Sequence, residues 1–143
     1  YPYGISVAAP ICYESVYGEH FGAFTADGAE LMMVITNDGW WHDTEGYRQH
    51  FSFSRLRAIE SRRWVCRAAN TGISGFISPT GKVGDTLGWD KRGTLSAEVT
   101  PSREVTFYAK AGDYLGRLGG YLFLLSLLYY VSYRFRKRSH LVN

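Results

Sequence analysis

The feature that most constrains this chain is an uncharged apolar run near its C-terminal end. Residues 118–133 read LGGYLFLLSLLYYVSY without one charged side chain, and residues 114–116 extend the run beyond Arg117. A helix needs about 20 residues to cross a bilayer core. Residues 114–133 are therefore predicted to form a transmembrane helix, with tyrosines at both ends suited to the membrane interface. A buried helix at the end of a soluble domain is the alternative, although the run is apolar on every face.

A basic cluster, RFRKR, follows this run at once and supplies most of the formal net charge of +3. Basic residues next to a span favour its cytoplasmic end. Residues 134–143 are therefore predicted to be a basic cytoplasmic tail, and residues 1–110 to lie on the extracytoplasmic side. Without this cluster the chain is close to neutral, which argues against binding to nucleic acid.

Upstream of the apolar run, segments of strand-like and helical character alternate. The stretches that read as strands are residues 4–11, 30–36 and 73–78, a hairpin partner from residue 83, and exposed strands at 93–100 and 105–109. The stretches that read as helices are residues 12–28 and 45–69. This alternation predicts an α/β domain over residues 1–110 with a partly parallel sheet.

Cys12 follows the first predicted strand directly and opens the first predicted helix. That position presents a side chain at the carboxyl edge of a sheet, where backbone amides favour a thiolate and an oxyanion. A cysteine is intrinsically nucleophilic, so acyl transfer through a thioester is the chemistry that this position favours. A small hydrophobic residue packed in the core is the alternative for Cys12.

Three motifs occur in order: ICYES, ITNDGWW and RLRAIESRRWVCRAANTGISGFISPTGKV. Together they resemble the nitrilase, or carbon–nitrogen hydrolase, superfamily and, within it, the apolipoprotein N-acyltransferase family. The resemblance implies an α/β fold, the C-terminal part of a nitrilase-like αββα sandwich, followed by one transmembrane helix. It also implies a place in the bacterial inner membrane, with the catalytic part in the periplasm.

The activity that the resemblance implies is acyl transfer from a phospholipid to a lipoprotein. The acceptor is the N-terminal amine of the lipid-modified cysteine of a bacterial lipoprotein, and the intermediate is a cysteine thioester. The partners are thus a phospholipid, a lipoprotein and the membrane, with no metal and no cofactor. An amidase of the same fold and a non-catalytic membrane-anchored remnant are the alternatives.

The resemblance assigns Cys12 as the nucleophile and Tyr13, Glu14 and Trp40 as substrate-binding or supporting residues. From the residues alone, Tyr13 can equally pack in the core, and Glu14 can be a solvated carboxylate favoured at a helix start. Trp40 and Trp41 are expected to point apart, one packing and the other lining a pocket or meeting lipid. The remaining family positions are interpreted as mainly structural: Asn37, Asp38, Glu60 and Arg67.

Other polar residues receive simpler interpretations. His42 and His50 lack a third ligand at metal spacing, which argues against a zinc site. Cys66 is expected on the second predicted helix, packed in the protein core. A disulfide between Cys66 and Cys12 would block the nucleophile. The arginines of that helix are expected to form a solvated or salt-bridged face: Arg55, Arg57, Arg62 and Arg63.

The chain departs from the family in one respect that bears on activity. Nitrilase-like enzymes add a Glu base and a Lys upstream of the cysteine, but no Glu or Lys precedes Cys12 here. Lys82 and Lys91 lie downstream and are not expected to substitute. The sequence therefore predicts the nucleophile-bearing fragment of a longer enzyme, inactive by itself.

Overall fold

The structure, a computed structural model, describes the backbone of residues 4–142 and the side chains of residues 4–137. The chain divides into two compact units, one ending at Gly112 and the other beginning at Asp113. Each unit is described by itself.

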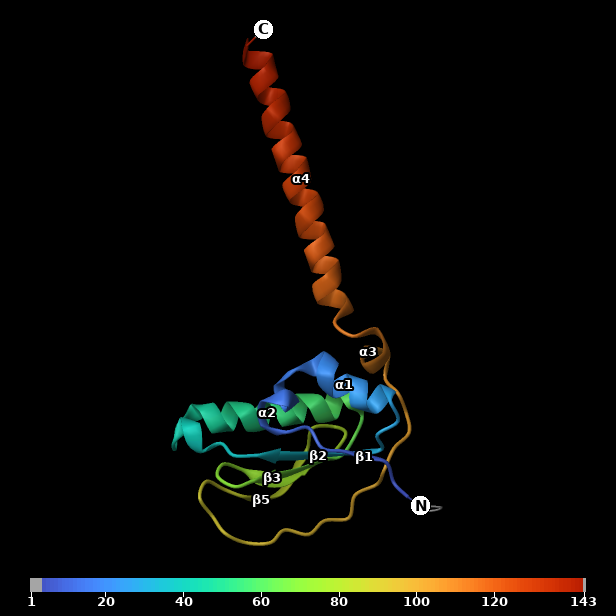
Figure 1. Cartoon of the computed structure of the whole chain (residues 1–143), viewed down its shortest axis with the longest axis vertical. Coiled ribbons are helices and arrows are strands. Elements are labelled where there is room, and N and C mark those ends of the chain that lie inside the picture. Colours follow the sequence, from blue (N-terminus) through green and yellow to red (C-terminus); the bar gives the residue numbers. More distant parts are fainter. Residues whose placement is uncertain (1–3, 143) are drawn as a thin grey trace. The chain divides into compact units, whose positions relative to one another are not determined.

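The first unit is built on a five-stranded sheet in the order β1-β2-β3-β4-β5 (Figure 1). Its strands are β1 (Val7–Ala8), β2 (Leu31–Thr36), β3 (Val65–Ala69), β4 (Ser74–Ile77) and β5 (Val83–Leu87). The first three strands run parallel, and β3, β4 and β5 pair antiparallel. The predicted α/β class with a parallel component is confirmed, as is the hairpin that β4 and β5 form, whereas β1 is much shorter than residues 4–11.

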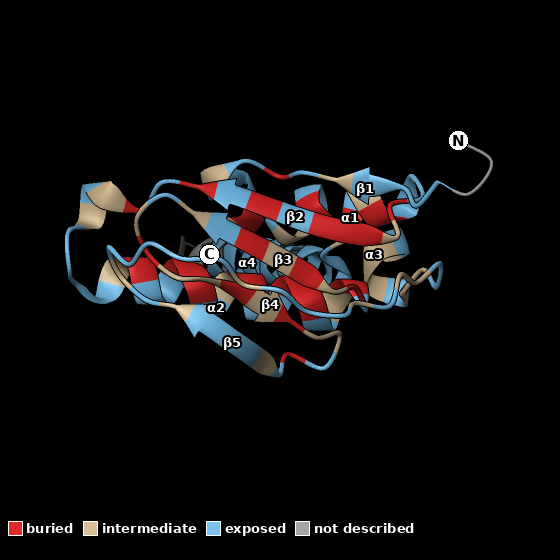
Figure 2. Ribbon diagram, turned by 90° about the horizontal axis from the view of Figure 1, so that it is seen from below, coloured by how far each residue is buried: buried red, intermediate tan, exposed pale blue. Residues whose placement is uncertain are grey.

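Helices cover one face of this sheet (Figure 1). They are the 3₁₀ turns η1 (Cys12–Val16) and η2 (Gly39–Trp41) and the helices α1 (Gly18–Ala26), α2 (Glu45–Ser61) and α3 (Phe107–Ala111). Side chains of β2 alternate, with Met32 and Val34 fully buried and Met33 exposed (Figure 2). Since strand side chains point to opposite faces in turn, the core lies between β2, β3 and the helix layer, where Phe21 and Phe51 complete it.

The predicted second helix, residues 45–69, is wrong in its last third. Helix α2 ends at Ser61, because Arg62 adopts a left-handed conformation with φ 54°. A strand then begins at Val65 and pairs in parallel with β2. The aromatic residue Trp64 and the β-branched residue Val65 favour a strand. In the strand, residues 65–69 form backbone hydrogen bonds with β2. Cys66 therefore lies in β3 and not in a helix.

Two further predicted strands are absent from the described chain. Residues 91–106 have no regular secondary structure, and residues 107–111 form α3 in place of a strand at 105–109. Thr106 caps α3 by accepting a hydrogen bond from the Ala109 N–H. Alternating sequence in residues 93–100 is insufficient for a strand, because it pairs with no neighbouring strand of the sheet.

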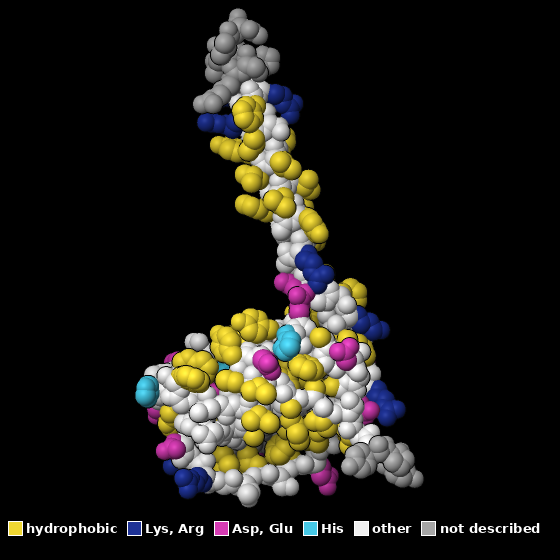
Figure 3. All heavy atoms as spheres, viewed as in Figure 1, with side chains coloured by type: hydrophobic (Ala, Val, Ile, Leu, Met, Phe, Trp, Pro, Cys, Tyr) yellow, Lys and Arg dark blue, Asp and Glu magenta, His cyan; other side chains and the backbone are white. Residues whose placement is uncertain are grey.

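The second unit contains one long helix, α4 (Tyr114–Val142). Its stretch Tyr114–Lys137 is the one described segment long and apolar enough to cross a membrane, and none of its side chains is buried within the protein. Apolar side chains surround this helix along most of its length (Figure 3). The segment is consistent with membrane association. The predicted boundary between residues 133 and 134 is not a break in the helix, and Asn143 of the predicted tail lies outside the described residues.

Candidate active site

Cys12 lies where the chain leaves the sheet. Pro10 is buried, and Ile11 forms an isolated parallel bridge with Ile35 of β2. Cys12 then opens η1 with a positive φ of 51°. A residue other than glycine rarely adopts this conformation, and such strained positions cluster at functional sites.

The segment after Cys12 is a short 3₁₀ turn and not the start of one long helix. Helix α1 begins only at Gly18, because Tyr17 is extended and separates the two elements. The Ser15 hydroxyl donates a hydrogen bond of 2.7 Å to the carbonyl oxygen of Cys12. The expectation that a regular helix starts at Cys12 is therefore wrong, and a tight turn fixed by side chains replaces it.

The two residues after Cys12 have distinct surroundings. Glu14 accepts a 2.7 Å hydrogen bond from the Ile11 N–H, so its carboxylate organises the turn around Cys12. Tyr13 is half-exposed, and its ring contacts those of Tyr17, Trp41 and His50 at centroid distances of 6.0, 6.4 and 5.9 Å. Tyr13 is therefore not packed in the core. Its ring lies at the protein surface, one residue after Cys12.

The adjacent tryptophans of η2 differ in environment. Trp40 is 76% exposed, whereas Trp41 is half-buried with its ring 5.3 Å from that of His50. A Cβ at Gly46 would collide with the Trp41 ring, so glycine is needed there for close packing. Trp41 is therefore the packed member of the pair, and Trp40 is the one whose ring is free to contact a ligand or lipid.

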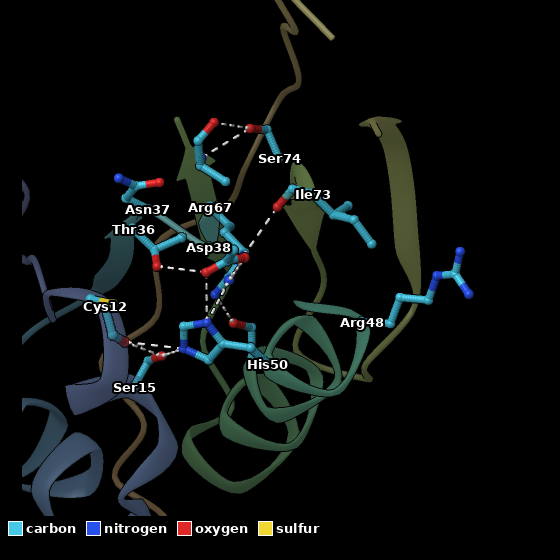
Figure 4. A network of polar contacts seen from close by, with 12 residues as sticks. Cys12, Ser15, Thr36, Asn37, Asp38, Arg48, His50, Arg67, Ile73 and Ser74 are labelled. Carbon is cyan, nitrogen blue, oxygen red and sulfur yellow. Dashed lines mark hydrogen bonds and ion pairs between the residues drawn. The ribbon is translucent and has the colours of Figure 1, made fainter. Parts of the chain in front are cut away.

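A buried polar network lies beneath Cys12 (Figure 4). The carboxylate of Asp38 contacts Nδ1 of His50 at 2.8 Å and accepts hydrogen bonds of 2.8 Å from Arg67 and from the Thr36 hydroxyl. His50 comes from α2, Arg67 from β3, and Asp38 follows β2, so the network joins three elements. The interpretation of Asp38 and Arg67 as structural residues agrees with this placement.

Glycine at position 72 makes room for this network. Gly72 has a φ of 107°, and a Cβ there would collide with the carboxylate of Asp38. Arg67 also donates to the Ser54 hydroxyl at 3.0 Å and to the Ile73 carbonyl at 3.2 Å. The buried charges thus have several partners, as buried charges require.

Electrostatics keep the Asp38–Arg67 pair ionised. Burial by itself raises the pKa of Asp38, but hydrogen bonds from His50 and Thr36 and the charge of Arg67 outweigh it and hold this pKa below its usual value. Burial lowers the pKa of Arg67, while the charge of Asp38 and the hydrogen bond to it act in the opposite direction. Each member of the Asp38–Arg67 pair is therefore stabilised in its charged form by the other.

His50 is the member of the site that sequence reasoning missed. It is 2% exposed, and its Nε2 lies 3.2 Å from the Cys12 carbonyl oxygen and 3.3 Å from the Ser15 hydroxyl oxygen. The sequence offered little signal for His50, because the same side of α2 also carries Ser54 and Arg57. The partners of His50 lie 12 and 38 residues away, and no local pattern identifies them.

The arginines of the α2 region do not all form a surface face. Arg63 is 1% exposed and donates to the Ala29 carbonyl at 2.8 Å, so its expected solvation is wrong. Burial lowers its pKa, and Glu104 and Glu30 partly offset that effect. Arg57 is buried in an ion pair with Glu60, whereas Arg55 and Arg62 are exposed.

The state of the two cysteines and the possible metal ligands can be described for residues 4–137. Cys12 and Cys66 are both free thiols, and no group of three or more His, Cys, Asp or Glu side chains is placed to hold a metal there. No hydrogen bond reaches the sulfur of Cys12 in this part of the chain. The site thus offers a half-buried thiol at the end of the sheet, next to a buried polar network.

Comparison with known proteins adds three findings. Residues 2–107 match the carbon–nitrogen hydrolase family. The chain is 36% identical over 126 residues to an apolipoprotein N-acyltransferase of Pseudomonas paraeruginosa, covering 87% of this chain and 24% of that protein. It is 35% identical over 121 residues to one from Thermotoga maritima, covering 85% and 24%. The chain thus spans about a quarter of the length of these curated relatives.

Among solved structures, the chain is similar to an amidase of the nitrilase superfamily from Nesterenkonia. The TM-score is 0.50 at 22% identity, over 59% of this chain and 34% of the amidase. This likeness concerns the fold alone. The match to the Pseudomonas protein is too long to fit within residues 2–107, so it also includes the first part of α4.

Proposed function

Because the chain belongs to the carbon–nitrogen hydrolase family, we propose that it carries the nucleophile of a phospholipid–apolipoprotein N-acyltransferase. The observation that carries this proposal is the length of the match to proteins of that name. The match covers both the domain that holds Cys12 and the first part of the apolar helix α4, and a membrane-spanning helix would keep an enzyme beside a phospholipid substrate.

In the first half-reaction, the Cys12 thiolate attacks the ester carbonyl carbon of a phospholipid. A carbon–sulfur bond forms, and the ester carbon–oxygen bond breaks when the tetrahedral oxyanion collapses. The lysophospholipid leaves as an alcohol once its oxygen takes a proton, and the acyl chain remains on Cys12 as a thioester.

In the second half-reaction, the N-terminal amine of a lipoprotein attacks the thioester carbon. A carbon–nitrogen bond forms, the carbon–sulfur bond breaks, and the thiolate of Cys12 returns. The amine must lose a proton, as must the Cys12 thiol at the outset. Since no side chain of residues 4–137 hydrogen-bonds the Cys12 sulfur, we assign the general base to polypeptide outside this chain, where the resemblance expects a Glu and a Lys.

The residues around Cys12 have supporting roles in this scheme. Glu14 fixes the turn by accepting a hydrogen bond from the Ile11 N–H. Tyr13 presents its half-exposed ring beside Cys12. Trp40, the exposed tryptophan, is suited to contact an acyl chain, because an indole buries a large apolar area. We place this face on the periplasmic side of the bacterial inner membrane, in accord with the basic cluster at the end of α4.

The test is acyl labelling of Cys12 in membranes that contain this chain together with the polypeptide that supplies the general base. Incubation with a phospholipid radiolabelled in its acyl chain should leave a hydroxylamine-sensitive label, which Cys12→Ser abolishes and Cys66→Ser retains. Addition of a diacylated lipopeptide with a free amine should discharge the label to an amide product. Discharge to free fatty acid alone would favour the amidase alternative, and amide formation by the Cys12→Ser variant would overturn the proposal.

A further inference from the structure

The most informative unassigned group is the imidazole of His50, because each of its nitrogens has a defined partner. Nδ1 lies 2.8 Å from a carboxylate oxygen of Asp38, with an Arg67 nitrogen 3.0 Å away. Nε2 lies 3.2 Å from the main-chain oxygen of Cys12. The ring is also enclosed by the side chains of Tyr13 and Trp41. His50 is therefore held in one orientation.

The partners of Nε2 determine where its proton lies. A carbonyl oxygen only accepts hydrogen bonds, so the contact with Cys12 requires Nε2 to be the donor. The Ser15 hydroxyl directs its own hydrogen to the same carbonyl at 2.7 Å, and so turns a lone pair toward Nε2. The Asp38 carboxylate beside Nδ1 likewise only accepts, so these contacts together call for a proton on both ring nitrogens of His50, with that of Nε2 directed at Cys12 and Ser15.

We infer that His50 is a positioning residue for Cys12, which it holds through the main-chain carbonyl and not through sulfur. The φ of 51° at Cys12 is disfavoured by about 1–2 kcal/mol for a residue with a Cβ. Hydrogen bonds from His50 and Ser15 to the Cys12 carbonyl fix the orientation of the following peptide group and offset this cost. Asp38 in turn fixes the ring, so the buried network supports the geometry of the nucleophile.

This inference rests on the proposed role of Cys12. Two substitutions distinguish a His50 that positions Cys12 from a His50 that only packs in the core. In His50→Asn the shorter amide can meet Asp38 but cannot reach the Cys12 carbonyl. In His50→Gln the longer amide can donate near the place of Nε2. If His50 positions Cys12, the reactivity of Cys12 should be kept in His50→Gln and lost in His50→Asn. If His50 only pairs with Asp38, His50→Asn should be tolerated at least as well as His50→Gln.

The measurement is the rate at which iodoacetamide alkylates Cys12, divided by the rate for Cys66 in the same molecule. Relative to the unmodified protein, His50→Asn should lower this ratio roughly tenfold, which lies within the loss of up to about a hundredfold that misplacing a reacting group by about an ångström can cause. His50→Gln should retain most of the ratio. His42→Asn is the matched control, because His42 is exposed and Asn tolerates its φ of 49°.

A second measurement needs no substitution. In ¹⁵N-edited imidazole spectra of the unmodified protein, Nε2 of His50 should be protonated and protected from exchange with water. An unprotonated Nε2, or a Cys12-to-Cys66 ratio unchanged in folded His50→Asn, would overturn the inference. Alkylation needs no acyl donor, so a protein that forms no thioester but shows the Asn and Gln difference would refute the proposed function and retain the role of His50.

Discussion

The two faces of the sheet differ in which side chains they bury and which they expose. Beneath the helix layer the chain buries charged groups, among them Asp38 and Arg67 at 2.8 Å from each other. On the other face the same strands present apolar side chains to solvent, such as Met33, which is 42% exposed, while Met32 beside it is 0% exposed. The register pairs Met33 with Cys66 and Cys66 with Phe76, so this apolar row crosses three strands.

The difference teaches that the helix-covered face is built for a site and the open face for packing. Charge is retained beneath the helices because Asp38 and Arg67 are hydrogen-bonded and their network reaches the Cys12 turn. No helix among residues 4–112 covers the open face, where Gly93 and Leu95 of the irregular segment line a hollow together with Met33 and Phe76. The αββα arrangement that the resemblance implies places a second sheet against a face of this kind.

The largest expected effect comes from breaking the buried ion pair. Arg67→Met keeps most of the volume but leaves the Asp38 carboxylate without its cation, and such losses cost about 3–5 kcal/mol of unfolding free energy. Arg103→Met is the matched control, because its pair with Glu30 has an exposed arginine, and we expect a loss of about 1 kcal/mol or less.

Urea unfolding followed by tryptophan fluorescence measures these losses for the first unit alone. All four tryptophans of the chain lie before Gly112, at positions 40, 41, 64 and 89. Equal destabilisation by the two substitutions would mean that the buried pair has no special weight, and would remove the contrast between the faces.

A smaller effect distinguishes adjacent methionines on β2. Met32→Ala should cost about 2–5 kcal/mol, since it opens a cavity beneath the helices. Met33→Ala should change the free energy of unfolding by roughly 0.5 kcal/mol, as surface substitutions usually do. The same urea titration compares them, and a loss at Met33 that matches the loss at Met32 would show that the open face is covered in the protein as studied.

The sequence predicted the sheet better than it predicted the support of the site. Apolar runs of strand length located β2 and the β4–β5 hairpin, because burial on the helix side leaves a pattern along each strand. Strand β3 was hidden, since helical spacing continues through residues 62–69 and the break depends on one left-handed residue, Arg62. Cys12 was identified from its place after a strand. His50 was not, because its role depends on a contact with a carbonyl 38 residues away.

The smallest effect is the pH dependence of stability that two acidic groups contribute, because their pKa values are shifted in opposite directions. Asp38 has a lowered pKa for the reasons given above, whereas burial raises the pKa of Glu60 and the charge of Arg57 only partly offsets it. A lowered folded pKa contributes stability that is complete above the ordinary value of 3.8 and is lost as pH falls through the folded value. A raised folded pKa contributes stability that is complete below the ordinary value of 4.5 and is lost as pH rises through the folded value.

Unfolding free energies measured between pH 3 and pH 7 therefore separate the two groups. Asp38→Asn should lower stability at neutral pH and flatten its decline on the acid side, because the titrating carboxylate is gone. Glu60→Gln should instead remove a loss that the unmodified protein shows as pH rises above 4.5. If Asp38→Asn kept the full acid decline, the carboxylate beneath Cys12 would not be the ionised anchor of the network, and the contrast between a charged inner face and an apolar outer face would rest on Arg67 alone.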